Sequence, residues 1–139
     1  EIDNIVAIKE AGCNMDQIAE VLKDAPDDFY MLSGEDSWTY PMMAMGAHGV
    51  ISVASNLVPG MVSDMVHKAL DRDLTGAREL HYKLFDLYKV IFIETNPAPV
   101  KAALEMMGMP AGKLRLPLVE PGENSKEKIR EVLESLELL

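Results

Sequence analysis

The sequence predicts an α/β fold, with parallel strands covered by helices over residues 1–72 and a helical region over residues 73–139. Two observations support this prediction. Three short apolar runs alternate with amphipathic segments in the first half, which is typical of parallel strands joined by helices. The apolar residues of the second half instead recur at helical spacing, and no run there is bounded like a strand.

The first strand is expected at Ile5–Ile8 and is followed by a helix. Asn14 precedes Gln17 by three residues, which resembles a capping box at a helix start. Apolar side chains then fall at positions i, i+3, i+4 and i+7: Met15, Ile18, Ala19 and Leu22. Pro26 ends this helix, because proline cannot continue the hydrogen-bonding pattern.

Two further strand–helix units follow. A strand at Phe29–Ser33 precedes a helix near Trp38–Met45, and a strand at Val50–Val53 precedes a helix near Met61–Leu70. The carboxyl ends of parallel strands gather at one edge of a sheet, where α/β proteins place their sites. Three such strands cannot close a barrel and leave an apolar face uncovered. Partner strands must come from another chain or from a larger protein, and we favour the larger protein.

The second half is expected to be helical. Its first helix is marked by apolar residues at helical spacing: Ala77, Leu80, Leu84, Leu87 and Ile91. The prolines of Glu94–Lys101 stop one helix and start the next. Lys113–Leu118 is predicted to be extended, and Asn124 with Glu127 to cap a final helix that runs to about Leu136.

Composition limits the classes of partner. The 139 residues carry a net charge of -10 and are 48% hydrophobic, which is typical of a globular domain. Acidic and basic residues are interspersed, which argues against binding to nucleic acid or to an anionic membrane. A single cysteine suits a reducing cytoplasm, and no apolar run reaches the length of a membrane span. The chain begins with Glu1 rather than methionine, so we expect sequence upstream of it.

Lys9 is the leading candidate for chemistry. In a strand, Lys9 shares one face with Ile5 and Ala7. If Val6 and Ile8 pack beneath helices, Lys9 points to the inner side of the sheet at its carboxyl end. Burial there favours the neutral amine, which can attack a carbonyl and form a Schiff base. The same pattern also fits a lysine that extends from a strand end into solvent.

The other two strand ends supply candidates for binding. Gly34 allows the backbone to approach a ligand closely, although the neighbouring Glu35 and Asp36 also fit the ordinary chemistry of a helix start. Ile51 or Val53 is placed to form the wall of a small pocket, or simply to join the core.

Other reactive residue types give weaker signals. Three histidines lie on different elements without the spacing of metal ligands: His48, His67 and His81. We therefore predict no metal site. Cys13 has no obvious activating base nearby in the sequence. Three methionines are more typical of helix core than of a cofactor contact: Met42, Met43 and Met45.

Five segments together resemble the dihydrodipicolinate synthase family of pyruvate-dependent class I aldolases. They are VAIKEAG, LSGED, GAHGVISVASN, ETNPAPVK and LRLPL, which occur in the family's order and span essentially the whole chain. The family folds as a (β/α)8 TIM barrel followed by a helical C-terminal domain. The resemblance thus implies that residues 1–72 supply the last three βα units and residues 73–139 the helical domain.

The resemblance also implies a chemistry. Lys9 matches the family's Schiff-base lysine, on which pyruvate condenses with aspartate semialdehyde in lysine and diaminopimelate biosynthesis. Gly34 and Ile51 match positions that line the pyruvate pocket. The covalent Schiff base requires no separate cofactor, and family members are expected to be cytoplasmic homo-oligomers, either dimers or tetramers.

Several parts of the family's site have no counterpart in this sequence. The threonine-bearing loop, the proton-relay tyrosines and the aldehyde-binding arginine belong to the first five barrel units. We therefore expect a missing N-terminal half as a partner, and little turnover from this chain alone. Two alternatives stay open: another pyruvate lyase that acts on a sugar acid, and a non-catalytic half-barrel that docks through its uncovered strands.

Overall fold

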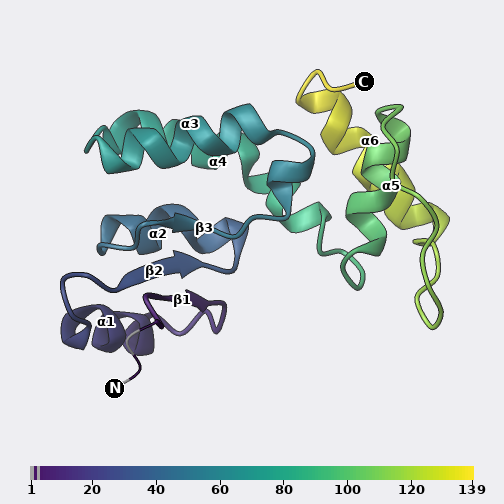
Figure 1. Cartoon of the computed structure of the whole chain (residues 1–139). Helices are drawn as coiled ribbons and strands as arrows, with labels where there is room; N and C mark the ends of the chain where they lie inside the picture. The colour runs from purple at the N-terminus through teal and green to yellow at the C-terminus, as the bar shows by residue number, and fades with distance from the viewer. Residues whose placement is uncertain (1, 3) are drawn as a thin grey trace. The chain divides into compact units, whose positions relative to one another are not determined.

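The computed structural model describes residue 2 and residues 4–139. Within them, three parallel strands form one sheet in the order β1-β2-β3 (Figure 1). The strands are β1 (Ala7–Glu10), β2 (Tyr30–Ser33) and β3 (Gly49–Val50). Helices separate the strands along the chain, which confirms the predicted α/β arrangement.

The strand boundaries differ from those predicted. β1 begins at Ala7 and includes Lys9, so that Ile5 and Val6 precede it. The prediction that Val6 and Ile8 pack beneath helices is wrong for this chain, because their side chains are 57% and 36% exposed. In the first unit, the central strand β2 instead contributes the buried Met31.

β3 is shorter than the predicted Val50–Val53 strand, because it ends at Val50. Pairing nevertheless continues for one residue, since the backbone N–H of Ile51 donates to the carbonyl oxygen of Ser33 at 2.8 Å. Ile51 therefore lies directly after the strand rather than within it.

The chain forms two compact units, and the first comprises the residues up to Ser52 together with Gly60–His81. Its helices are α1 (Met15–Asp24), η1 (Asp36–Trp38), α2 (Thr39–Ala44), α3 (Pro59–Leu70) and the start of α4 (Leu74–Val90). A buried cluster joins α1, β2 and α2: Ile18, Met31, Met42, Met43 and Ala47. The prediction of a core role is confirmed for Met42 and Met43, whereas Met45 is 37% exposed.

The start of α1 confirms half of the predicted capping box. The side chain of Asn14 accepts hydrogen bonds from the backbone N–H groups of Asp16 at 3.2 Å and Gln17 at 3.3 Å. The side chain of Gln17 does not complete the box, because it donates to Oε2 of Glu10 at 3.3 Å. The hydrogen bond from Gln17 to Glu10 therefore ties the first turn of α1 to the end of β1.

The second unit comprises Val53–Pro59 and Tyr82–Leu139, and it is helical as predicted. It contains η2 (Ala54–Asn56), the end of α4, α5 (Ala98–Met106) and α6 (Glu123–Ser135). α5 and α6 pack against each other (Figure 1). Its fully buried side chains come mainly from α4 and α6: Leu84, Leu87, Tyr88, Ile91, Ile129 and Leu133.

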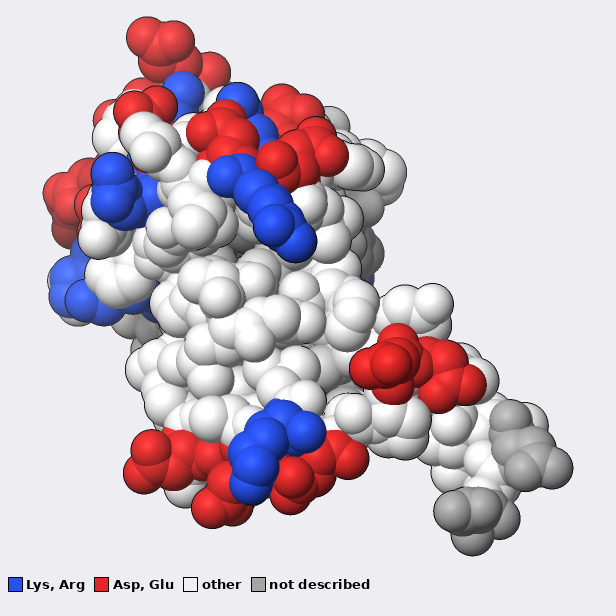
Figure 2. All heavy atoms as spheres, turned by 90° about the vertical axis from the view of Figure 1, so that its left-hand side faces the viewer, with Lys and Arg blue, Asp and Glu red and all other residues white. Residues whose placement is uncertain are grey.

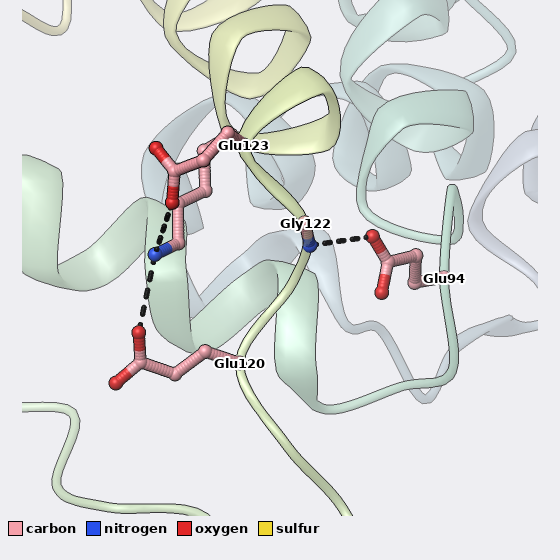
Figure 3. Close-up of polar contacts among 5 residues, drawn as sticks. Glu94, Glu120, Gly122 and Glu123 are labelled. Carbon is pink, nitrogen blue, oxygen red and sulfur yellow. Dashed lines mark hydrogen bonds and ion pairs between the residues drawn. The ribbon is translucent and has the colours of Figure 1, made fainter.

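The predicted start of the last helix is wrong. α6 begins at Glu123 with Gly122 as its N-cap residue, rather than being capped by Asn124. A side chain from elsewhere in the chain supplies the cap, since Glu94 accepts a hydrogen bond from the N–H of Gly122 at 2.9 Å (Figure 3). Hydrogen bonds from the Ser125 side chain and the Gly122 backbone lower the pKa of Glu94 below its ordinary value. This distant partner is the reason that a local capping pattern fails here.

The charged side chains on the surface can be compared with what nucleic acids and membranes require of a partner. On the face drawn in Figure 2, basic side chains lie next to acidic ones, and no continuous basic area is visible there. In the described part of the chain, no helix combines the length and the apolar character needed to cross a bilayer.

Candidate active site at the carboxyl edge of the sheet

Lys9 and Gly34 meet at the carboxyl edge of the sheet. Lys9 pairs in register with Leu32, which places it on the face opposite Met31 and its packed helices. The N–H of Gly34 donates to the carbonyl oxygen of Glu10 at 2.7 Å, so the two strand ends are joined directly. The predicted direction of Lys9, toward the side of the sheet away from the helices, agrees with this register.

Gly34 is required by the close approach of the lysine side chain. A Cβ atom placed on Gly34 would lie 2.8 Å from Cε and 3.1 Å from Cγ of Lys9. It would also lie 2.6 Å from Cβ of Ala11. Carbon atoms do not pack at such distances, so the absence of a side chain at Gly34 makes room for the lysine stem.

Ile51 reaches the same edge from β3. Its backbone is fixed by the hydrogen bond to Ser33, and its side chain is 49% exposed. The three residues singled out from the sequence therefore stand at the ends of three adjacent parallel strands, and the structure brings two of them into contact.

The lysine is exposed in this chain. The predicted neutral amine of Lys9 depended on burial of the side chain, and the residues that the structure describes do not bury it. A lysine amine on an open sheet edge can still attack a carbonyl carbon and release water to form an imine.

Glu10 is a feature of the site that the sequence reasoning missed. Its side chain is only 9% exposed, although it follows the lysine at the end of an edge strand. Its Oε1 accepts a hydrogen bond from the N–H of Gly12, and its Oε2 accepts one from Nε2 of Gln17 at 3.3 Å. A carboxylate next to a candidate nucleophile was visible in the sequence, but its burial was not.

A polar network closes the ends of the other two strands. The buried hydroxyl of Ser33 donates to the carbonyl oxygen of Glu35 at 2.8 Å, and the Glu35 carboxylate accepts from the Ser37 hydroxyl at 3.2 Å. The hydroxyl of Ser52 donates to the buried Asp36 carboxylate. The Glu35 carboxylate also accepts from the N–H of Ser37, which is the helix-start role that the sequence left open.

Cys13 lies in the loop between β1 and α1 with a positive φ of 52°. Burial raises the pKa of its thiol, and the carboxylates of Glu35 and Glu10 raise it further. The thiol is thus held in its protonated form, which is the opposite of what a nucleophilic cysteine needs. No group of three or more potential metal ligands occurs in residue 2 or residues 4–139.

Comparison with known proteins identifies relatives of the whole chain. Residues 1–136 match the Dihydrodipicolinate synthetase family. The 4-hydroxy-tetrahydrodipicolinate synthase of Archaeoglobus fulgidus is 50% identical over 139 residues, which are 100% of this chain and 48% of that protein. The enzyme of the same name from Aquifex aeolicus is 52% identical over 138 residues, or 99% of this chain and 47% of that protein.

Solved structures give the same result. The crystal structure of dihydrodipicolinate synthase from Aquifex aeolicus superposes with a TM-score of 0.96 at 52% identity, covering 99% of this chain and 47% of that one. The Thermotoga maritima enzyme gives a TM-score of 0.95 at 42% identity, covering 100% and 48%. The chain therefore has the fold of part of these proteins, and it spans about half the length of the curated relatives that it matches.

Proposed function

The chain belongs to the dihydrodipicolinate synthetase family, and we propose that it carries the Schiff-base lysine of a pyruvate-dependent aldolase. In this proposal Nζ of Lys9 attacks the ketone carbon of pyruvate, and loss of water gives an imine. The imine loses a methyl proton to become an enamine, whose carbon attacks the aldehyde of aspartate semialdehyde. The product serves lysine and diaminopimelate biosynthesis.

The observation that carries the proposal is the contact between Lys9 and Gly34 at the carboxyl edge of the parallel sheet. Sites of α/β barrels lie at this edge. We assign the Gly34 backbone and Ile51 to the walls of the pyruvate pocket, because both follow strands adjacent to the lysine strand. The exposure of Lys9 supports a pocket that needs further elements to enclose it.

We infer that the complete enzyme consists of this chain and an N-terminal barrel half. Residues 1–72 then form the last three βα units of a (β/α)8 barrel, and residues 73–139 form its helical C-terminal domain. The proposal includes a homodimer or homotetramer in the cytoplasm, and the single cysteine fits such a reducing compartment. This chain alone is expected to turn over little substrate, because the proton relay belongs to the other half.

Complementation tests this proposal. The chain is mixed with the N-terminal half of the Aquifex aeolicus relative, and the condensation of pyruvate with aspartate semialdehyde is measured. Activity that depends on both halves and on Lys9 supports the proposal, with Lys9→Arg as the control that keeps the charge. Activity only with a sugar-acid aldehyde would instead assign the chain to another branch of pyruvate lyases.

A second candidate is a non-catalytic assembly module. It is favoured by the exposed apolar side chains on and beside the sheet: Ile5, Val6, Tyr30 and Ile51. Exposed apolar side chains of this kind are typical of a surface that another protein covers. Complementation with no turnover for any aldehyde, together with tight association of the two halves, would favour this module.

A further inference from the structure

Glu10 is a buried carboxylate for which the proposed chemistry has no role. The residue lies at the end of β1, immediately after the proposed nucleophile, and its side chain turns back into the protein rather than toward solvent. Burying a carboxylate costs free energy unless hydrogen bonds compensate for the lost water. The environment of Glu10 supplies those bonds from two separate segments.

The first segment is the loop that connects β1 to α1. The N–H of Gly12 donates to Oε1 of Glu10, which fixes the chain two residues beyond the strand. A Cβ atom on Gly12 would lie 2.7 Å from the same oxygen, so this position also requires glycine for the carboxylate to fit. The second segment is the first turn of α1, where Nε2 of Gln17 donates to Oε2.

The loop held by Glu10 includes Ala11, whose Cβ packs on the same surface of Gly34 as the stem of Lys9. The backbone of Glu10 is itself bonded to Gly34, since its carbonyl oxygen accepts the Gly34 N–H. Lys9, Gly34 and Ala11 therefore form one packed arrangement, and Glu10 clamps it from the strand, the loop and the helix. Release of the loop would move Ala11 away from Gly34, beside which the lysine stem lies.

We propose that Glu10 is a positioning residue that directs the amine of Lys9, by fixing the loop between β1 and α1 against Gly34. This inference rests on the proposed Schiff-base role of Lys9. The role of Glu10 is geometric: its oxygen atoms hold the loop, so a neutral side chain of the same shape fills the role. Glutamine keeps an acceptor for Gly12 and leaves an amide facing Gln17, whose own amide can rotate to accept from it.

The test compares the lysines of the 139-residue chain with one another. Wild type, Glu10→Ala and Glu10→Gln are incubated with pyruvate and cyanoborohydride, and adducts on Lys9 and on the exposed Lys128 are quantified by peptide mass spectrometry. In parallel, trace acetic anhydride reports the ratio of acetylation at the same two lysines. Glu20→Ala, which removes an exposed carboxylate of α1, serves as the matched control.

Misplacing a reacting group by about 1 Å can cost up to about 100-fold in rate, so Glu10→Ala should slow adduct formation on Lys9, relative to Lys128, by at least about tenfold. Acetylation of Lys9 should not fall with it, because an unclamped amine remains accessible to a small reagent. Glu10→Gln should restore the pyruvate adduct to near wild type, and Glu20→Ala should change neither ratio.

An equal ratio of pyruvate adducts on Lys9 and Lys128 in wild type and Glu10→Ala would overturn the inference, as would a Glu10→Gln variant that behaves like Glu10→Ala. If Glu10→Ala fails to fold, as judged by circular dichroism, Gln17→Ala removes one of the two bonds and should give a smaller loss in the same direction. A wild type without preference for Lys9 in the pyruvate reaction, both alone and with the added N-terminal half, contradicts the proposed function. In that case the loop itself decides the inference about Glu10: the N–H of Gly12 should exchange with deuterium faster in Glu10→Ala than in wild type, and should return to the wild-type rate in Glu10→Gln.

Discussion

At the scale of single residues, Gly34 gives the sharpest prediction. Gly34→Ala would place a methyl group 2.8 Å from Cε of Lys9, and the lysine stem must move to avoid it. The rate of pyruvate adduct formation on Lys9 should fall by about tenfold or more, because the amine leaves its site. The measurement is trapping with cyanoborohydride, followed by peptide mass spectrometry.

Gly60 offers a matched control for this substitution. A Cβ atom on Gly60 would meet nothing within 4 Å, and the residue lies in the first turn of α3. Gly60→Ala should leave the adduct rate unchanged. A wild-type rate in Gly34→Ala would show that Lys9 does not need the space beside Gly34.

The residues of the site could be predicted from the sequence only in part. Lys9 and Gly34 follow apolar runs whose ends parallel strands bring together, whereas Ile51 was selected over Val53 only through the family resemblance. The burial of Glu10 could not be predicted, since it depends on Gly12 and Gln17 turning toward the same carboxylate. That arrangement exists only after β1, the loop and α1 have folded.

At the scale of elements, the N-cap of α1 can be tested directly. Asn14 satisfies two backbone N–H groups at the start of the helix, and Asn14→Ala removes both bonds. The free energy of unfolding should fall by about 1 kcal/mol, measured by urea denaturation. A change no larger than that of an exposed mid-helix substitution, such as Glu20→Ala, would contradict the capping role.

The cap of α6 makes stability depend on pH. Glu94 has a lowered pKa in the folded chain, so its stabilising contribution is complete above the ordinary glutamate value of about 4.3 and is lost as the pH falls through the lower folded value. In Glu94→Gln, the free energy of unfolding should therefore fall less than in wild type when the pH drops below about 4.3. The urea midpoint at neutral and acidic pH measures this difference.

Glu127→Gln is the control for that measurement, because Glu127 is an exposed carboxylate of the same helix. It should keep the wild-type dependence on pH. The same acid sensitivity in Glu94→Gln as in wild type would show that the bonds to Gly122 and Ser125 do not couple helix stability to ionisation.

The packing of α6 can be tested independently of its cap. Ile129 is fully buried in the second unit, whereas its neighbour Arg130 is exposed. Ile129→Ala should destabilise the chain by about 2–5 kcal/mol, and Arg130→Ala by less than about 0.5 kcal/mol. Thermal and urea unfolding check both values, and equal losses would contradict the assignment of Ile129 to the core.

Helices were easier to predict than strand limits. α1 and α3 follow from apolar periodicity, from Asn14 and from the proline after the first helix. β1 was misplaced by two residues, because Ile5 and Val6 resemble buried strand residues and yet are exposed here. In the proposed barrel, further elements would cover Ile5 and Val6, whereas the described residues of this chain leave them exposed.

At the scale of the whole molecule, the exposed apolar side chains of the sheet predict association. Addition of the N-terminal half of the Aquifex aeolicus relative should give a complex of larger mass, measured by sedimentation across a concentration series. Replacement of Val6 by Asp places a charge on this surface and should weaken the complex, whereas Leu139→Asp, at an exposed residue of the second unit, should not. A mass unchanged by the added half would contradict the barrel assignment.

The central claim is that Lys9 is the Schiff-base nucleophile, and trapping with pyruvate and borohydride tests it most directly. The chain, alone and with the added N-terminal half, is reduced in the presence of pyruvate and its intact mass and peptides are measured. We predict one reduced pyruvyl adduct on Lys9, faster in the completed protein and absent in Lys9→Ala. An adduct spread over the surface lysines, or none on Lys9 in the completed protein, would contradict the claim.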